Sequence, residues 1–140
     1  MIQISQQVTD HFMLEECVCP CCNKLLLIPR FWRHMVRLEG IRQGLGFPMT
    51  INSGCRCAEH NASIGGADNS EHLRFATDVR PEWPDGKDGD NEYFLRLDAM
   101  YNEAILIGFT GVKKYSTWVH MDLREGPKWI VPELRNYTSH

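Results

Sequence analysis

The stretch "NSEHLRFATDVRP", residues 69–81, joins a polar turn to an apolar strand and carries His72 and Asp78 close together. Successive side chains of a strand point to opposite faces of the sheet. In the second half of the stretch this alternation places Asp78 on one face with Ala76, and Thr77 on the other. The stretch therefore predicts a strand that presents one carboxylate, with a histidine just before it.

A second strand is predicted at "WVHMDL", residues 118–123. Strict alternation sends His120 and Asp122 to one face and the apolar residues beside them to the other. If the two strands are neighbours in one sheet, His120 meets Asp78 across it. The sequence thus predicts a polar cluster on one face of a sheet whose opposite face is apolar.

Apolar periodicity and punctuation predict the remaining elements. Residues 30–44 follow Pro29 with apolar residues at near-helical spacing, which indicates an amphipathic helix. A second helix ends near Gly108, residues 48–53 form a short strand, and residues 111–125 form two strands joined by a turn.

The polar connection at residues 54–70 is long for a compact domain, and loops of this length are often functional. We expect His34, inside the first predicted helix, to be exposed to solvent. Together these features predict an α+β fold over residues 1–140, a single small domain in which helices pack on a mainly antiparallel sheet.

The composition is that of an ordinary globular protein, with 43% hydrophobic and 24% charged residues and a formal net charge of -3. Such a charge gives no electrostatic reason to expect nucleic acid as a partner. No stretch reaches the ~20 apolar residues needed to cross a bilayer, and residues 1–16 lack a basic start followed by an apolar run. We therefore expect cytoplasmic synthesis without a signal peptide or an integral membrane segment, and we also expect a monomer.

His72, Asp78 and His120 are residue types that hold zinc, which prefers nitrogen, sulfur or carboxylate oxygen. A catalytic zinc site uses three protein ligands and leaves a fourth position for water. Bound zinc lowers the pKa of that water and polarises a carbonyl group, so the reaction class is hydrolysis of an amide or ester. The alternative is that these histidines have hydrogen-bonded structural roles, and spacing alone leaves both interpretations open.

In this order, "CPCC", "INSGCRCAEHNASIGGADNSEHLRFATDVR" and "WVHMDLR" resemble the zinc D-Ala-D-Ala carboxypeptidase and L-alanyl-D-glutamate endopeptidase family, especially its compact phage and prophage forms. By position, the resemblance implies zinc ligands at His72, Asp78 and His120. It also implies that Arg56 lies near the carboxylate or the reacting carbonyl of the substrate, where a guanidinium group stabilises negative charge.

Two features depart from the family pattern near the metal site. The segment "HLRFATD" lacks the family's glycine and places Asp78 one position closer to His72, and Thr117 stands where many relatives have the Glu or Asp that acts as general base. Asp122 is then the nearest carboxylate, either as proton acceptor or as a residue that orients a ligand. If Asp122 only orients a ligand, the base would come from one of three loop residues, Glu59, His60 or Glu71.

Six cysteines form two clusters, "CVCPCC" and "CRC". Cys19 and Cys22 have the C-x-x-C spacing of a zinc knuckle, and Cys55 with Cys57 would complete a four-sulfur site. Three interpretations stay open: buried small apolar residues, a structural metal site, or disulfides if the protein works in an oxidising periplasm.

The resemblance implies a zinc metallopeptidase that hydrolyses an amide bond in the peptidoglycan stem peptide, in the manner of a phage or prophage endolysin. Such an enzyme would act on the cell wall once a partner opens the membrane. A first alternative is a non-catalytic zinc-binding phage structural or wall-recognition module of the same fold, which Thr117 and the shortened "HLRFATD" favour. A second is a zinc-ribbon interaction protein organised by the cysteines alone.

Overall fold

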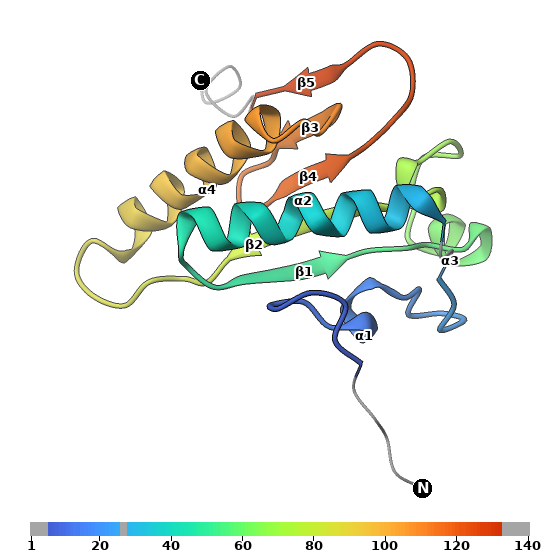
Figure 1. Ribbon diagram of the computed structural model, residues 1–140, viewed down its shortest axis with the longest axis horizontal. Helices are drawn as coiled ribbons and strands as arrows, with labels where there is room; N and C mark the ends of the chain where they lie inside the picture. The colour runs from blue at the N-terminus through green and yellow to red at the C-terminus, as the bar shows by residue number, and fades with distance from the viewer. Residues whose placement is uncertain (1–5, 26–27, 133–140) are drawn as a thin grey trace, which may run out of the picture.

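The computed structural model of the protein describes residues 6–25 and 28–132. Its centre is a five-stranded sheet with the strand order β1-β2-β4-β3-β5 (Figure 1). The strands are β1 (Met49–Ser53), β2 (Ala76–Pro81), β3 (Gly111–Lys114), β4 (Val119–Asp122) and β5 (Trp129–Val131). Only the pair of β3 and β5 is parallel among these named strands. The predicted α+β class with a mainly antiparallel sheet is confirmed.

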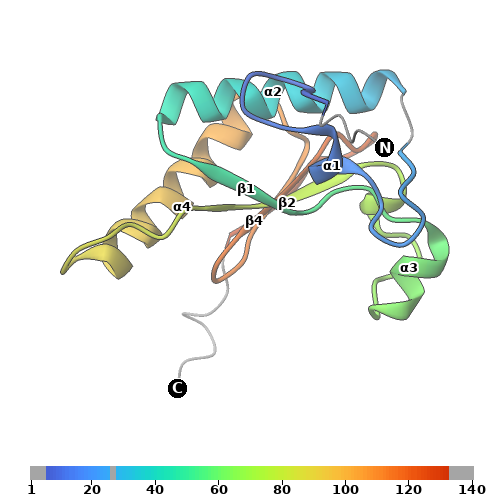
Figure 2. The same cartoon turned by 90° about the horizontal axis from the view of Figure 1, so that it is seen from below.

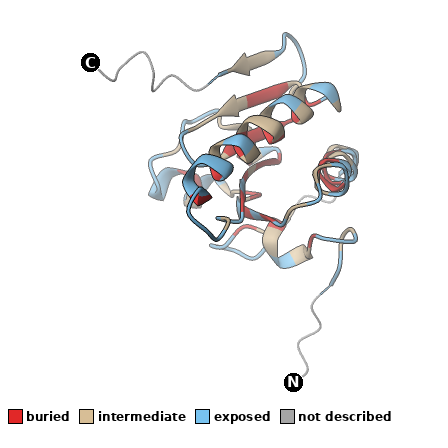
Figure 3. Cartoon of the chain, turned by 90° about the vertical axis from the view of Figure 1, so that its left-hand side faces the viewer, coloured by how far each residue is buried: buried red, intermediate tan, exposed pale blue. Residues whose placement is uncertain are grey.

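Two long helices pack against each other and on one face of the sheet (Figure 2). They are α2 (Pro29–Leu45) and α4 (Gly89–Leu106), and the shorter elements are α1 (Leu14–Cys17), α3 (Ala58–Ser63) and a 3-10 turn, η1 (Glu71–Leu73). Buried residues concentrate between the helices and the sheet (Figure 3). Within the described ranges, no helix combines the length and apolarity needed to span a bilayer.

The register of β2 and β4 positions the polar cluster. The two strands are antiparallel, with Asp78 opposite His120 and Ala76 opposite Asp122. Val119 and the other apolar residues of β4 point the other way, into the core. The predicted meeting of His120 with Asp78 across neighbouring strands is therefore confirmed.

Helix α2 explains how the core face of the sheet is covered. It begins at Pro29, in the first turn where a missing N–H costs no hydrogen bond. Phe31 and Met35 lie on its buried side, in contact with the core beneath the sheet. The helix predicted for residues 30–44 thus extends one residue further at each end.

The prediction that His34 is exposed is wrong. Its side chain is fully buried, its Nε2 lies 2.8 Å from the hydroxyl oxygen of Thr77, and its ring packs edge-on against Phe75 and Phe109. Burial holds the pKa of His34 well below its ordinary value, so the ring is neutral. A polar side chain of β2 supplies the partner, which the sequence of the helix alone does not reveal.

Three other elements differ from the sequence-based prediction. Helix α3 lies within the polar connection at residues 54–70, where there is no apolar periodicity to indicate it. Helix α4 begins at Gly89, ahead of its first strongly periodic residues. Strand β5 is a short edge strand that pairs with β3, and no alternating pattern precedes it.

A buried carboxylate fastens the N-terminal segment to α2. Glu39 accepts the backbone N–H of His11 at 2.8 Å and a side-chain N–H of Gln43 at 3.0 Å, and its second oxygen lies 2.6 Å from Nδ1 of His11. Burial opposes ionisation of Glu39, but its polar surroundings, with Thr9, His11 and Gln43, lower its pKa from 4.5 to about 2.

We expect the Glu39→Gln variant to be less stable than wild type by about 1–3 kcal/mol at pH 7, because the amide cannot replace the charged acceptor. The pKa of Glu39 is lowered on folding, so its contribution is fully present above pH 4.5 and is lost as the pH falls toward 2. Urea unfolding of both proteins between pH 7 and pH 2 measures the difference. A gap that stays constant over this range would contradict the proposed role of the carboxylate.

Candidate metal centre

Three potential metal ligands from different elements converge on the polar face of the sheet. His72 lies in η1, Asp78 in β2 and His120 in β4, and one ligand atom from each lies within 4.8 Å of the others. The two oxygens of Asp78 divide between the rings, with Oδ2 at 3.2 Å from Nε2 of His72 and Oδ1 at 3.1 Å from Nδ1 of His120. The structure thus brings the three predicted residues together.

The opposite nitrogen of each ring faces an atom that can only accept a hydrogen bond. Nδ1 of His72 lies 2.7 Å from the carbonyl oxygen of Gly54, and Nε2 of His120 lies 2.7 Å from the carboxylate of Asp122. These nitrogens therefore carry hydrogen and donate it. In the neutral rings, the remaining nitrogens point their lone pairs at Asp78.

Two ring lone pairs and one carboxylate facing each other require a cation among them, either a metal ion or additional protons. Nitrogen and carboxylate ligands, each histidine fixed through its second nitrogen, match a zinc site with an open fourth position. The residues present therefore fit zinc, with Nε2 of His72, Nδ1 of His120 and a carboxylate oxygen of Asp78 as the ligand atoms.

The pKa values of His120 and Asp78 also reflect their mutual contact. Burial alone would lower the pKa of His120, but hydrogen bonds to Asp122 and Asp78 raise it above its ordinary value. Burial would raise the pKa of Asp78, but His120 and His72 hold it well below its usual range. Asp78 is therefore an anion at neutral pH, as a metal ligand has to be.

Asp122 is fully buried and all of its acceptor capacity is engaged. Its Oδ1 accepts the backbone N–H and Nε–H of Arg124 at 3.0 and 2.9 Å, and its Oδ2 accepts from Arg124 at 2.6 Å and from His120. Burial opposes ionisation, but His120 and Arg124 hold the pKa of Asp122 well below its usual range. This geometry favours the orienting role for Asp122 over that of proton acceptor.

Gly111 on β3 leaves the room that Asp122 occupies. It pairs with Asp122 in the register of β3 and β4, and a Cβ added to Gly111 would overlap the carboxylate of Asp122. A glycine is therefore required beside the carboxylate that holds His120.

Arg56 lies at the edge of the centre and is held by its own loop. Its backbone N–H donates to the carbonyl oxygen of His72 at 3.0 Å, and its guanidinium group donates to Ser53 and Asn61, both at 3.3 Å. One guanidinium nitrogen lies 3.6 Å from Oδ2 of Asp78. Arg56 thus lies beside the three potential metal ligands, and its predicted contact with the substrate stays a prediction.

Phe75 has an unusual backbone conformation in the short connection between His72 and Asp78. Its backbone has φ 126°, a conformation that favours glycine, and its side chain is fully buried against the ring of Phe31 at 5.0 Å. The connection therefore tightens at Phe75, and both ligands still reach the centre.

A cavity of about 490 Å³ opens onto the three ligands. One wall is aromatic, formed by Tyr115 and Trp118, whose rings stack at 4.4 Å, and by Trp129. Besides Asp78, the acidic residue in the cavity lining is Glu71, whose carboxylate pairs with Arg30 at 2.7 Å. Of the loop residues considered as a base, Glu71 is the one that lines this cavity, and Thr117, Glu59 and His60 lie outside its lining.

The cysteines divide into two groups that differ from the predicted four-sulfur set. Cys17 and Cys55 belong to the apolar core, and burial raises the pKa of Cys17 to about 12. The sulfurs of Cys19, Cys22 and Cys57 lie within 4.8 Å of one another. Burial would raise the pKa of Cys19, but backbone N–H groups, first that of Cys57, lower it to about 7. None of the six cysteines, all of which lie within the described residues, forms a disulfide.

Comparison with known proteins gives one family. The model of the family described as Peptidase M15 matches residues 10–122 of the chain, a range that includes His72, Asp78 and His120. No curated protein matches the chain at a significant level.

We expect the Gly111→Ala variant to bind zinc about 10- to 100-fold more weakly, because the new methyl group displaces the carboxylate that orients His120. The same overlap should lower the free energy of unfolding by about 1–3 kcal/mol. Zinc titration and urea unfolding measure both effects. The matched control is Gly44→Ala in α2, where an added Cβ meets nothing within 4 Å; wild-type zinc affinity in both variants would contradict the role of Gly111.

We expect both Phe75→Ala and Phe75→Gly to lose about 3–5 kcal/mol of side-chain packing. The glycine variant should nevertheless be the more stable of the two, by about 1 kcal/mol, because it relieves the strained backbone. At Phe31, which is equally buried but helical, alanine should be the more stable replacement. The same order at both positions in urea unfolding would show that Phe75 carries no strain.

Proposed function

The chain belongs to the peptidase M15 family, whose members are zinc-dependent metallopeptidases, and we propose that it hydrolyses an amide bond in the peptidoglycan stem peptide. The observation that carries the proposal is the convergence of one ligand atom each from His72, Asp78 and His120 on one point of the cavity. Zinc bound there supplies a Lewis acid for the peptide carbonyl and makes its bound water a nucleophile near neutral pH.

The roles of the surrounding side chains follow from their positions. Asp122 accepts the Nε2 hydrogen of His120 and fixes the orientation of the ring. Arg56, whose guanidinium group lies at the edge of the cavity, binds a carboxylate of the substrate or the oxyanion that develops at the carbonyl. The stem peptide carries free carboxylates, so a fixed guanidinium group suits this substrate class.

Glu71 is the best-placed proton acceptor for the attacking water. Glu71 is one of the residues that line the cavity, whereas the carboxylate of Asp122 is enclosed by Arg124 and His120. The ion pair with Arg30 fixes one oxygen of Glu71, and its second oxygen lies 3.5 Å from the exposed side chain of Arg74. That second oxygen is the atom that we assign to hold the proton.

We further propose that the protein is a cell-wall hydrolase of the phage or prophage endolysin type, made in the cytoplasm and active on the wall after the membrane has been opened. The resemblance of its motifs, in their order along the chain, to the compact phage and prophage forms of the family supports this placement. The aromatic wall of Tyr115, Trp118 and Trp129 supports binding of an extended peptide beside the metal ligands.

A second function is favoured by one observation. Thr117 stands where many relatives have the base, and Glu71 is held by an arginine. A module of the same fold that binds zinc and the cell wall without cleaving it would show these features. Zinc binding together with a complete absence of peptide release would favour this module.

The test is digestion of purified peptidoglycan, followed by chromatography of the released fragments, alongside metal analysis of each protein. Wild type should release fragments and lose this activity with a chelator. His120→Ala should lose the zinc of this centre and all detectable hydrolysis, because the ligand is removed. Arg56→Ala should keep this zinc and turn over about 100-fold more slowly. Full hydrolysis by a folded His120→Ala protein would refute the centre.

A further inference from the structure

Cys19 and Cys22 lie in a turn that hydrogen bonds close between Cys19 and Lys24. The backbone N–H of Cys19 donates to the carbonyl oxygen of Lys24 at 2.9 Å. The N–H of Asn23 donates to the carbonyl oxygen of Cys19 at 2.7 Å. Asn23 adopts a left-handed backbone with φ 58°, a conformation that asparagine tolerates better than most residues. The turn thus holds two thiols on the same side of the chain, as in a metal-binding knuckle.

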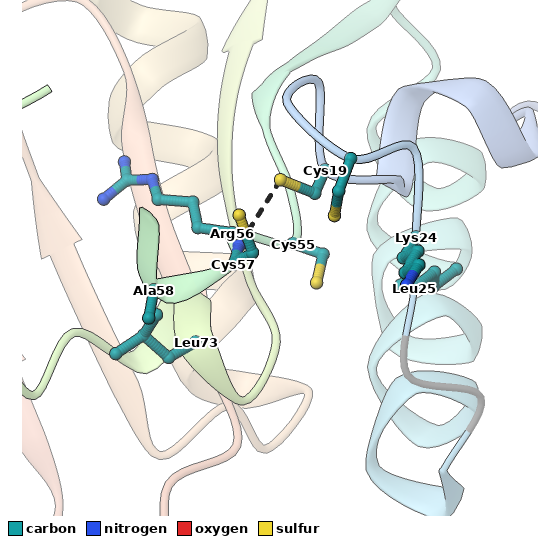
Figure 4. A pocket seen from close by; sticks show the side chains of 9 residues that line it. Cys19, Lys24, Leu25, Cys55, Arg56, Cys57, Ala58 and Leu73 are labelled. Atoms are coloured by element: carbon teal, nitrogen blue, oxygen red, sulfur yellow. Dashed lines mark hydrogen bonds between the residues drawn. The ribbon is translucent and has the colours of Figure 1, made fainter. Parts of the chain in front are cut away.

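Cys57 brings a third thiol to this turn from the loop after β1 (Figure 4). Its backbone N–H donates to the sulfur of Cys19 at 3.3 Å, and its own sulfur accepts the N–H of His60 at the same distance. Donors aimed at sulfur stabilise the thiolate form, which is the form that binds metal. The sulfurs of Cys19 and Cys57 therefore each have a backbone N–H that stabilises the thiolate.

The arrangement differs from that of cysteines that serve as packing residues. Cys17 and Cys55 are members of the apolar core, and their sulfurs lie outside the group of three. Cys19, Cys22 and Cys57 line a cavity of about 660 Å³, and although Cys55 lines it too, its sulfur lies outside the group. Packing alone gives no reason for three sulfurs to gather there.

We propose that Cys19, Cys22 and Cys57 bind a second zinc ion, separate from the centre at His72, Asp78 and His120, with Cys21 as the fourth ligand. Three or four thiolates at tetrahedral spacing select zinc among the common divalent ions. Cys21 is exposed and its thiol interacts with that of Cys57, so a change of its side-chain rotamer completes the set.

The proposed site would stabilise the loop that serves the first centre. Gly54, whose carbonyl oxygen orients His72, lies so close to the N-terminal segment that an added Cβ would be 2.7 Å from the carbonyl oxygen of Cys17. The N–H of Cys55 donates to the same carbonyl at 2.9 Å. A metal bound by Cys57 would add a further link between this loop and the N-terminal segment, on the other side of Arg56. The inference does not rest on the proposed peptidase activity, since it concerns metal binding alone.

The test is the zinc content, by mass spectrometry, of proteins purified with a reductant. Wild type should hold two zinc ions per chain, while Cys57→Ser and His120→Ala should each hold one. Cys55→Ser is the matched control, since it removes a thiol of the same loop that lies outside the group, and it should hold two. Cys22→Ser, at an exposed position, tests the same site without disturbing the core.

Cobalt substitution identifies the ligands. Thiolate-bound Co²⁺ gives a charge-transfer absorption in the near ultraviolet, which should appear in wild type and in His120→Ala and vanish in Cys57→Ser. In Cys21→Ser it should fall by about a quarter, as four thiolates become three. An unchanged band would remove Cys21 from the site. A single zinc in wild type that survives Cys22→Ser and Cys57→Ser, or a disulfide among these cysteines in the purified protein, would overturn the proposal.

Discussion

Asp78 lies between two histidines that each turn one ring nitrogen toward its carboxylate, and this contact governs the polar face of the sheet. Its position opposite His120 is fixed by the ladder of β2 and β4, while His72 reaches it from the turn that precedes β2. A buried carboxylate needs a cation within a few ångströms, because desolvation without one costs several kcal/mol. The register of β2 and β4 thus creates the need for a cation beside Asp78, and a bound metal ion would meet this need.

The opposite face of the same strand keeps this geometry rigid. Thr77, the neighbour of Asp78, points into the core and pairs with His34 of α2, while Phe75 packs against α2 just before the strand. These contacts fix the core side of β2, while the candidate metal site lies on the opposite, polar face of the sheet. A ligand held on a packed strand is positioned more accurately than one on a free loop.

The sequence predicts the parts of this design that depend on local periodicity. The alternation of polar and apolar residues in β2 and β4 indicates which side chains share a face, and Asp78 then meets His120 because the two strands are neighbours in the sheet. The burial of His34 could not be predicted in this way, because it depends on a contact with Thr77, which is distant in sequence. Likewise, no local pattern shows that Phe75 takes a glycine-like backbone or that Glu71 faces the cavity while Asp122 is enclosed.

The loop from Gly54 to Cys57 shows why the site could only partly be predicted. Four consecutive residues there contact four different parts of the protein. The carbonyl of Gly54 orients His72, and Cys55 packs in the core. Arg56 reaches Asp78, and the sulfur of Cys57 lies beside the N-terminal turn. The "CRC" motif suggests that its two thiols act together, yet they enter different surroundings, one the core and the other the N-terminal turn. The residue between them, Arg56, is the one whose guanidinium group reaches Asp78 on the polar face of the sheet. A tie on either side of Arg56 restricts the motion of its guanidinium group, which makes this short loop the mechanical link between the two clusters of potential metal ligands.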